Sequence, residues 1–533
     1  MGINAGCVAQ VWLMTVAFLW ATGVPVTQAQ LPECETDVLM VDDGASGDKF
    51  GWSAAVRGDY AFFGANNAMN EMNVATGAVY VFTRNELEWT LHQKLTPPLT
   101  DGTTGAYFGV AQAVSGDLLI VGAKHANEGN LETPGTLATG AAYVFHLDAG
   151  SWVAEVKLVA SDGETDDRFG ASVAIDGHMA VVGAPWRSSP VDNLGAAYFF
   201  RRGITGWVQV TKKLAPITQR NSEFGNAVAI SGNWAAVGAY LHDDPEFCGD
   251  YPSCNTGVVW MYYYEGGTWR RGSKLLPTVP GELDNFGALV ALDGDVLAVV
   301  ARKADGAVAD TGAVYVFRRN DMDTLDSLAD DQWLEEAKLF AGDGIAGDLF
   351  GRSLALKGND IVVGAYRDEP PGAADTYNSG SAYLFRYDGK DWVEYARFEG
   401  SEFSKDDRYG QSVATDGDYM VAGAYGYADF KGKAYTVRLS VGEDCDGNGH
   451  PDECDVIFDP AGNDTNGNGV LDACECVSDA DCDDMLFCTT DICNQNTIRC
   501  ERVVADGYCV VRGFCTPERF TNPYNECEEC NPN

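Results

Sequence analysis

The sequence predicts an all-β protein: a seven-bladed β-propeller of four-stranded antiparallel blades, followed by a small acidic, cysteine-rich region. Three observations support this fold class. A Phe-Gly or Tyr-Gly pair recurs seven times at intervals of roughly sixty residues. Short apolar runs separated by glycine-containing turns follow each pair, as expected for strands. The composition then changes abruptly at residue 443, and most of the 16 cysteines lie beyond that point.

The N-terminus predicts an export signal spanning residues 1–29. Residues 8–26 carry no charge, and the small residues of Thr27-Gln28-Ala29 stand at the usual cleavage spacing. The apolar run is also long enough to cross a bilayer, so a retained anchor is the alternative. No other segment could cross a membrane, so we expect no integral membrane span after signal cleavage.

The repeat organises residues 30–442 into the predicted propeller. Its Phe-Gly or Tyr-Gly pairs are Phe50-Gly51, Phe108-Gly109, Phe169-Gly170, Phe224-Gly225, Phe286-Gly287, Phe350-Gly351 and Tyr409-Gly410. Seven copies of about sixty residues each are typical of propeller blades, because one blade needs four short strands and their turns.

The third copy shows how one blade is encoded. Residues 172–175 and 179–182 are short apolar runs, as strands buried on both faces should be. Asp176-Gly177 between them predicts a tight hairpin turn, because Gly accepts positive φ. Residues 196–200 form an aromatic third strand, and the more polar segment from Trp207 to Leu214 forms an outer fourth strand.

These motifs resemble the FG-GAP repeat of integrin alpha-subunit propellers over roughly residues 36–440. Besides the Phe-Gly pair, the resemblance rests on a Gly-x-x-Tyr/Trp-x-Phe/Tyr strand and on a Gly-Ala pair. The Gly-Ala pair occurs at Gly64-Ala65, Gly122-Ala123, Gly183-Ala184, Gly238-Ala239, Gly364-Ala365 and Gly423-Ala424, with Val300-Ala301 in the fifth copy. Integrin propellers hold calcium in long loops between their first two strands. The corresponding turns here are two residues long, so only the architecture is expected to transfer.

The last copy predicts how the ring closes. After the strand over residues 434–439, no outer strand from Trp to Leu follows. The segment 36–41 near the N-terminus has the composition of the missing strand. We therefore expect residues 36–41 to complete the seventh blade, which leaves no open sheet edge.

The loops of the two propeller faces differ. The loops between second and third strands vary in length, and alternating strand direction places them on the same face as the loops between blades. The latter loops carry the acids Asp42, Asp43, Asp48, Asp162, Glu164, Asp166, Asp167, Glu282, Asp284, Asp343, Asp348, Asp406 and Asp407. Because binding sites concentrate on variable loops over rigid scaffolds, we expect any ligand on this face. Cys248 and Cys254 predict a disulfide in its longest loop.

Residues 443–475 predict two tandem calcium-binding loops. Acidic or amide side chains stand at loop positions 1, 3, 5, 9 and 12, a backbone carbonyl is expected at position 7, and Gly449 and Gly469 occupy the turn at position 6. The candidate Ca²⁺ ligands are Asp444, Asp446, Asn448, His450, Asp452 and Asp455, then Asp464, Asn466, Asn468, Val470, Asp472 and Glu475. The segment resembles dockerin and thrombospondin type 3 repeats, and a pair of polar linkers is the alternative.

Residues 476–533 predict a disulfide module. Ten cysteines lie between Cys474 and Cys530, and apolar residues are too few for an independent core. The disulfide connectivity and the oligomeric state remain open.

The chain has a formal net charge of −42, which disfavours nucleic acid as a partner because phosphate would be repelled. Its six histidines stand at unrelated repeat positions, and no catalytic motif emerges. We therefore predict a secreted or cell-surface, non-enzymatic binding or adhesion protein that recognises an extracellular protein or glycan. A structural or assembly component that docks through the calcium segment is the alternative, and a carboxylate-based carbohydrate-active enzyme ranks third.

Overall fold

A computed structural model describes residues 34–439, apart from gaps at 86–87, 99–103, 128–137, 189–190, 217–218, 249–253, 307, 322–327, 370–377 and 402–403. It also describes the backbone of four short strands within residues 489–517. The signal segment 1–29 and the calcium loops 443–475 lie outside the described residues, so both stay predictions. No helix in the described part of the chain is long and apolar enough to span a bilayer.

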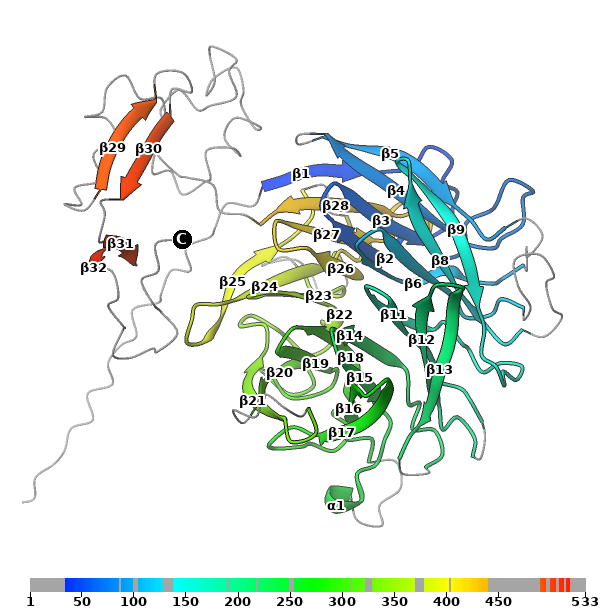
Figure 1. The fold of residues 1–533 in the computed structure, drawn as a ribbon. Coiled ribbons are helices and arrows are strands. Elements are labelled where there is room, and N and C mark those ends of the chain that lie inside the picture. The colour runs from blue at the N-terminus through cyan, green and yellow to red at the C-terminus, as the bar shows by residue number, and fades with distance from the viewer. Residues whose placement is uncertain are drawn as a thin grey trace, which may run out of the picture.

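Seven four-stranded antiparallel sheets are arranged radially around one axis and confirm the seven-bladed propeller (Figure 1). The first three blades contain β2 (Phe50–Arg57), β3 (Tyr60–Ala65), β4 (Ala78–Asn85), β5 (Glu88–Leu95); β6 (Phe108–Ser115), β7 (Leu118–Ala123), β8 (Ala141–Asp148), β9 (Ser151–Leu158); and β10 (Ser172–Asp176), β11 (Met179–Ala184), β12 (Ala196–Gly203), β13 (Gly206–Leu214).

The next three blades contain β14 (Ala227–Ser231), β15 (Trp234–Ala239), β16 (Val258–Glu265), β17 (Thr268–Leu275); β18 (Phe286–Asp293), β19 (Val296–Ala301), β20 (Ala313–Asn320), β21 (Gln332–Leu339); and β22 (Phe350–Lys357), β23 (Asp360–Ala365), β24 (Ser381–Tyr387), β25 (Trp392–Phe398). The seventh contains β26 (Ser412–Thr415), β27 (Tyr419–Ala424), β28 (Lys433–Arg438) and the N-terminal β1 (Cys34–Leu39). Two single-turn helices, α1 (Pro245–Cys248) and α2 (Tyr427–Phe430), lie in loops.

Ring closure follows the prediction. β1 pairs antiparallel with β28, with Val38 opposite Tyr435 and Leu39 opposite Ala434 (Figure 1). The strand spans residues 34–39 rather than 36–41, so its start and end are each two residues earlier than expected. The two ends of the propeller thus share one blade.

The motif residues form the joints between blades. In the third blade, the carbonyl of Gly225 lies so close to Gly183 that a Cβ on Gly183 would stand 1.9 Å from it. The Ser172 hydroxyl donates to the same carbonyl at 2.8 Å. Equivalent serine bonds join Ser53 to Gly109, Ser353 to Gly410 and Ser412 to Gly51, the last across the closure. The Phe-Gly and Gly-Ala pairs are therefore two sides of one contact between neighbouring blades.

The aromatic residues of the motif fill the core of each blade. Phe169 is fully buried and meets Tyr198 and Phe200 of the third strand edge-on, at centroid distances of 5.3 and 6.0 Å. Phe108, Phe286 and Phe350 pack on the equivalent pairs in their own blades. Such aromatic contacts supply both buried area and a fixed ring geometry, which holds the strands in register.

Beyond the propeller, two short hairpins are described within the region predicted as a disulfide module. β29 (Thr489–Asn494) pairs with β30 (Arg499–Val504), and β31 (Tyr508–Val511) pairs with β32 (Phe514–Pro517). The first pairing sets Cys493 opposite Cys500.

Candidate functional site

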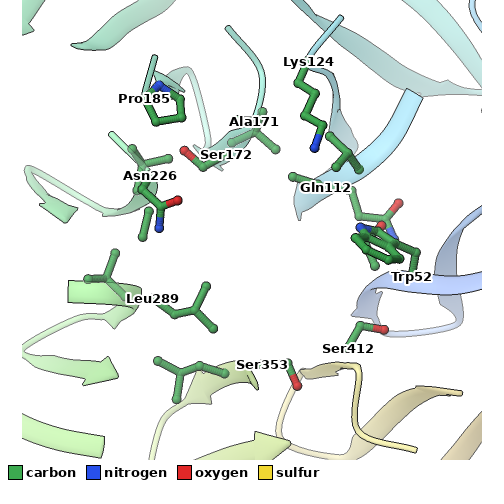
Figure 2. Close-up of a pocket in the computed structure, with 18 of the residues that line it drawn as sticks. Trp52, Gln112, Lys124, Ala171, Ser172, Pro185, Asn226, Leu289, Ser353 and Ser412 are labelled. Atoms are coloured by element: carbon green, nitrogen blue, oxygen red, sulfur yellow. The ribbon is translucent and has the colours of Figure 1, made fainter. Parts of the chain in front are cut away.

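The propeller encloses a cavity of about 510 Å³ on its axis. Its wall is formed by the first strand of each blade, since these innermost strands face one another around the axis. Figure 2 shows side chains from different blades, among them Trp52, Lys124 and Asn226, reaching inward around this space. A volume of this size is within the range of small-ligand pockets, about 300–1,000 Å³.

Three positions of each repeat surround the mouth of the cavity on the face of the variable loops. The residue before the Phe-Gly pair and the residue after it lie at the start of the first strand, and the residue after the Gly-Ala pair lies at the end of the second. In each repeat, one of these three positions carries a charged residue. In chain order the seven charged residues are Lys49, Lys124, Arg168, Glu223, Arg302, Arg352 and Arg408.

We call the six cations of this set the basic girdle. Lys124, Arg168, Arg302 and Arg352 line the cavity itself, and Glu223 is the acid among them. Lys49 and Arg408 flank it, because Lys49 lies over the Trp52 ring and Arg408 is close enough to Arg352 to perturb it. The chain as a whole has 78 acidic and 36 basic residues, so the girdle is a positively charged cluster within an acidic protein.

Aromatic rings separate and support the girdle cations. Lys49 lies 5.2 Å from the centre of the Trp52 ring, and Lys124 lies 5.2 Å from that of Tyr107. Arg352 lies 5.5 Å from the Tyr366 ring and donates to Gln411 at 3.1 Å. These contacts hold the cations over ring faces without neutralising them.

The girdle cations disfavour one another's charge. Burial, with the nearby Arg168 and Lys49, lowers the pKa of Lys124. Burial and the Arg352 guanidinium lower the pKa of Arg302 to about 10. Perturbed pKa values in a cleft are typical of binding and active sites.

Glu223 does not neutralise the girdle. Burial raises its pKa, and its carboxylate is held by hydrogen bonds from Tyr240 and Trp186, with Arg168 the neighbouring cation. In the part of the chain that the structure describes, the buried Nε atoms of Arg168 and Arg302 have no hydrogen-bond partner. Two of the arginines that line the cavity therefore keep a buried guanidinium N–H without a partner among the described residues.

Most of the loop acids that the sequence offered as a ligand face are engaged in holding the loops. One group accepts the backbone N–H of the residue three positions earlier, at 2.6–2.9 Å, and it comprises Asp48, Asp167, Asp284, Asp348 and Asp407. A second group accepts a third-strand tyrosine hydroxyl at 2.9 Å, and it comprises Asp43, Asp162 and Asp343. These eight of the thirteen acids stabilise the loops. Of the other five, Glu164 pairs with Arg187 and Asp406 accepts from the Asn378 amide.

The longest variable loop contains a disulfide between Cys248 and Cys254, with a Cα–Cα distance of 5.9 Å, as the sequence predicted. Next to it, His242 and Asp244 are almost fully buried, and Asp244 pairs with Lys274. Burial lowers the pKa of His242, which favours its neutral form. These contacts anchor the base of the loop in the fourth blade.

The predicted calcium ligands, from Asp444 to Glu475, lie outside the described residues. Among the residues whose positions are described, no cluster of His, Cys, Asp or Glu could hold a metal ion.

Reading the sequence copy by copy missed the basic girdle. The signal appears only when the seven copies are aligned, because the same three repeat positions then carry Lys49, Lys124, Arg168, Arg302, Arg352 and Arg408. Each cation stands alone in its own copy, so no local motif marks it.

The fold and the paired glycines at its joints define a β-propeller built from repeated blade motifs. The family model for the FG-GAP repeat matches residues 35–82, 89–145, 152–200, 207–251, 269–317, 333–385 and 392–437. These seven matches together cover more than half of the chain, and the chain belongs to the FG-GAP repeat family.

The other comparisons add little. The comparison with curated proteins found no match. A chain in the solved structure titled "Crystal Structure of Mitotic Checkpoint Complex" is similar over 82% of this chain and 99% of its own, at 11% identity and a TM-score of 0.44. A likeness that weak supports no functional argument.

Proposed function

We propose that the protein is a secreted or cell-surface, non-enzymatic binding protein that recognises an extracellular protein or glycan through the variable-loop face of its propeller. The observation that carries this proposal is the axial cavity of about 510 Å³, which opens among the variable loops and is lined by cations and aromatic side chains. Membership of the FG-GAP repeat family, whose propellers are typically non-catalytic, also supports it.

The scaffold suits recognition because it is rigid where the loops are anchored. Buried aspartates such as Asp167 close the loops between blades, and Arg187 pairs with Asp162, Glu164 and Asp167 beside them. The disulfide between Cys248 and Cys254 constrains the longest loop. A loop ordered before binding loses less conformational entropy when it meets a ligand.

Calcium is the second part of the proposal. The tandem loops over residues 443–475 would bind Ca²⁺ through carboxylate, amide and backbone oxygens. Because amides replace several carboxylates, we expect modest affinity, suited to the millimolar calcium found outside cells. Replacing the first ligand of each loop, in an Asp444→Ala, Asp464→Ala double variant, should abolish saturable Ca²⁺ binding measured by calorimetry.

The test of recognition is binding of the full chain to an array of glycans and matrix proteins, in calcium and in chelator. Saturable binding that persists in chelator and in the calcium-loop double variant would support recognition by the propeller. Binding that requires calcium and is lost in the double variant would instead support the alternative, an assembly component that docks through residues 443–475. The absence of binding under every condition would contradict both.

A further inference from the structure

We propose that the basic girdle binds the acidic group of a glycan, a carboxylate or sulfate carried on a sugar residue that enters the axial cavity. This inference rests on the proposed function, because it assigns a ligand class to the same face of the propeller. It identifies the site by its chemistry: converging cations, aromatic faces and amide side chains around one cavity.

Cations from several blades converge on the cavity. Lys124, Arg168, Arg302 and Arg352 come from four different blades and line the same cavity. Arg168 and Arg302 each keep a buried Nε without a hydrogen-bond partner in the described residues. A guanidinium is a planar fork that matches a carboxylate or sulfate, so an anion on the axis could accept from two or more of these groups at once.

Gathering these cations at one cavity has an energetic cost. Burial, together with neighbouring cations, lowers the pKa of Lys124 and of Arg302, so the charged girdle destabilises the folded chain and needs a reason to be held together. A bound anion would replace this mutual repulsion by attraction. Elsewhere in the propeller, Arg187 and Arg319 have carboxylate partners in Asp167 and Asp331.

The cavity wall indicates what carries the acidic group. Trp52 and Asn226 line the cavity together with Gln112, whose Oε1 is buried without a hydrogen-bond partner in the described part of the chain. Aromatic faces pack against the apolar C–H face of a sugar ring, and amides bond its hydroxyl groups. A few polar groups set among apolar and aromatic walls are typical of small-ligand sites.

The acidic surface of the protein limits the size of the ligand. The whole chain carries a formal net charge of −42, and acidic side chains such as Asp42 and Glu282 are exposed in the loops around the mouth. This field repels a long polyanion while the girdle attracts a charge that has entered the mouth. The site therefore fits a terminal or singly charged acidic sugar better than a highly sulfated chain or a nucleic acid.

The experiment is calorimetric titration of the full chain with D-galacturonate and galactose 6-sulfate, with galactose as the neutral counterpart, at low ionic strength. We expect both acidic sugars to bind at least about tenfold more tightly than galactose, since charged hydrogen bonds are lost with the neutral sugar. Equal affinity for galactose would overturn the proposal.

Variants test the residues. Arg302→Gln and Lys124→Gln should each weaken acidic-sugar binding by about tenfold or more. Arg220→Gln is the matched control, because Arg220 is on a loop of the same face but has a 73% exposed side chain paired with Asp192. If Arg302 had a purely structural role, Arg302→Gln would lower the melting temperature. If Arg302 is repelled by the other girdle cations, the same substitution should leave the melting temperature unchanged or raise it. Retained binding in both girdle variants would overturn the site.

A tetraglutamate peptide distinguishes the ligand class. If the peptide binds at least tenfold more tightly than either acidic sugar, the assignment to glycans is wrong and an acidic protein segment is the ligand. The failures of the two proposals are distinguishable. An array ligand that binds Arg302→Gln and the unchanged chain equally would leave recognition by the propeller standing and remove the girdle from it. If the acidic sugars bind but no array ligand is found, the girdle assignment would stand and recognition of an array ligand would not.

Discussion

The glycines of the repeated motif are required by close contacts with a neighbouring blade. Gly170 has φ +86°, and a Cβ there would stand 2.1 Å from the Ala141 carbonyl oxygen of the preceding blade. Gly183 has its close contact with Gly225 instead. The fifth blade departs from this pattern, because Val300 replaces glycine and its side chain meets Gly351 of the sixth. The joint thus tolerates a larger residue on one side where glycine remains on the other.

This joint predicts that Gly183→Ala is more destabilising than Gly177→Ala. The added methyl at Gly183 would collide with backbone, which must shift, at a cost of at least about 2 kcal/mol. Gly177 lies in the exposed turn with φ +50° and nothing within 4 Å of an added Cβ, so its cost is about 1 kcal/mol of backbone strain. Urea unfolding of the two variants measures this order, and equal costs would contradict the joint.

A buried loop carboxyl predicts a pH-dependent stability. Burial, together with Asp368, Asp343 and Glu369, raises the pKa of Asp348 to about 6, although the Ile345 N–H opposes the shift. Between the ordinary value of 3.8 and about 6 the folded chain holds more protons than the unfolded chain, so this group's contribution to stability falls as pH rises.

Asp348→Asn should therefore gain stability relative to the unchanged chain as the pH rises from 4 to 7, by about 2 kcal/mol. The amide is neutral throughout and its oxygen can still accept from Ile345. Chemical unfolding at the two pH values provides the measurement. Asp42→Asn, at an exposed position of an equivalent loop, is the control and should show a smaller change. A difference independent of pH would contradict the raised pKa.

At the scale of elements, a clamp that recurs in three blades ties the loop before a blade to that blade's outer strands. Tyr198 on β12 and Lys212 on β13 both donate to Asp162, which lies in the loop before this same blade. The first and sixth blades use Asp43 and Asp343 with the tyrosine and cation of the same two strand positions. Neighbouring strands thus present a hydroxyl and a cation to one carboxylate.

Removal of this clamp, by Asp162→Ala, should destabilise the propeller by about 1 kcal/mol at pH 7. Burial opposes ionisation of Asp162, but hydrogen bonds from Lys212 and Tyr198 outweigh it and lower its pKa. A lowered carboxyl pKa adds stability above its unfolded value of 3.8, and this contribution is lost as the pH falls through the folded value. The effect of the substitution should therefore shrink below about pH 4. An exposed acid of another loop, changed in Glu282→Ala, should have little effect at either pH.

Over the whole molecule, the propeller is held as a ring by contacts between its first and last blades. β1 completes the sheet of β26–β28, and the Ser412 hydroxyl donates to the Gly51 carbonyl at 2.9 Å. On the opposite face, the Gly58 N–H donates to Asp416 at 2.7 Å. Closure therefore involves both ends of the chain's propeller region and both faces of the ring.

Deleting residues 31–41 should lower the melting temperature by more than about 10 °C, because it removes the outer strand of the closing blade and exposes the edge of β28. Should the deleted chain fail to fold, Leu39→Asp and Met40→Asp provide the comparison. Leu39 is 4% exposed and Met40 is 51% exposed, so only the first buries an unpaired charge. An unchanged melt for the deletion or for Leu39→Asp would contradict closure by β1.

Several elements of the propeller could be read from the sequence. The seven blades, the tight turn at Asp176-Gly177, the outer strand from Trp207 to Leu214 and the closing N-terminal strand were all predictable. The blades, turns and outer strands depend on local periodicity and turn chemistry that recur along the chain, and the closing strand followed from the missing outer strand of the last copy. The limits of β1 were missed by two residues, because pairing with β28 rather than local composition sets where that strand begins. The chemistry of residues 443–475 is likewise a sequence prediction, based on ligand spacing.

By itself, the sequence determined the class of fold, the number of blades and the mode of closure, because repeated local signals specify strands and turns. Only the tertiary structure decided what the loop acids do and where the cations gather. Asp162 and Asp167 stabilise a loop because, in the folded blade, Asp162 accepts from the Tyr198 hydroxyl and Asp167 accepts from a backbone N–H. Lys124, Arg168 and Arg302 are far apart along the chain, and they surround one cavity because radial packing brings the same repeat positions to the axis.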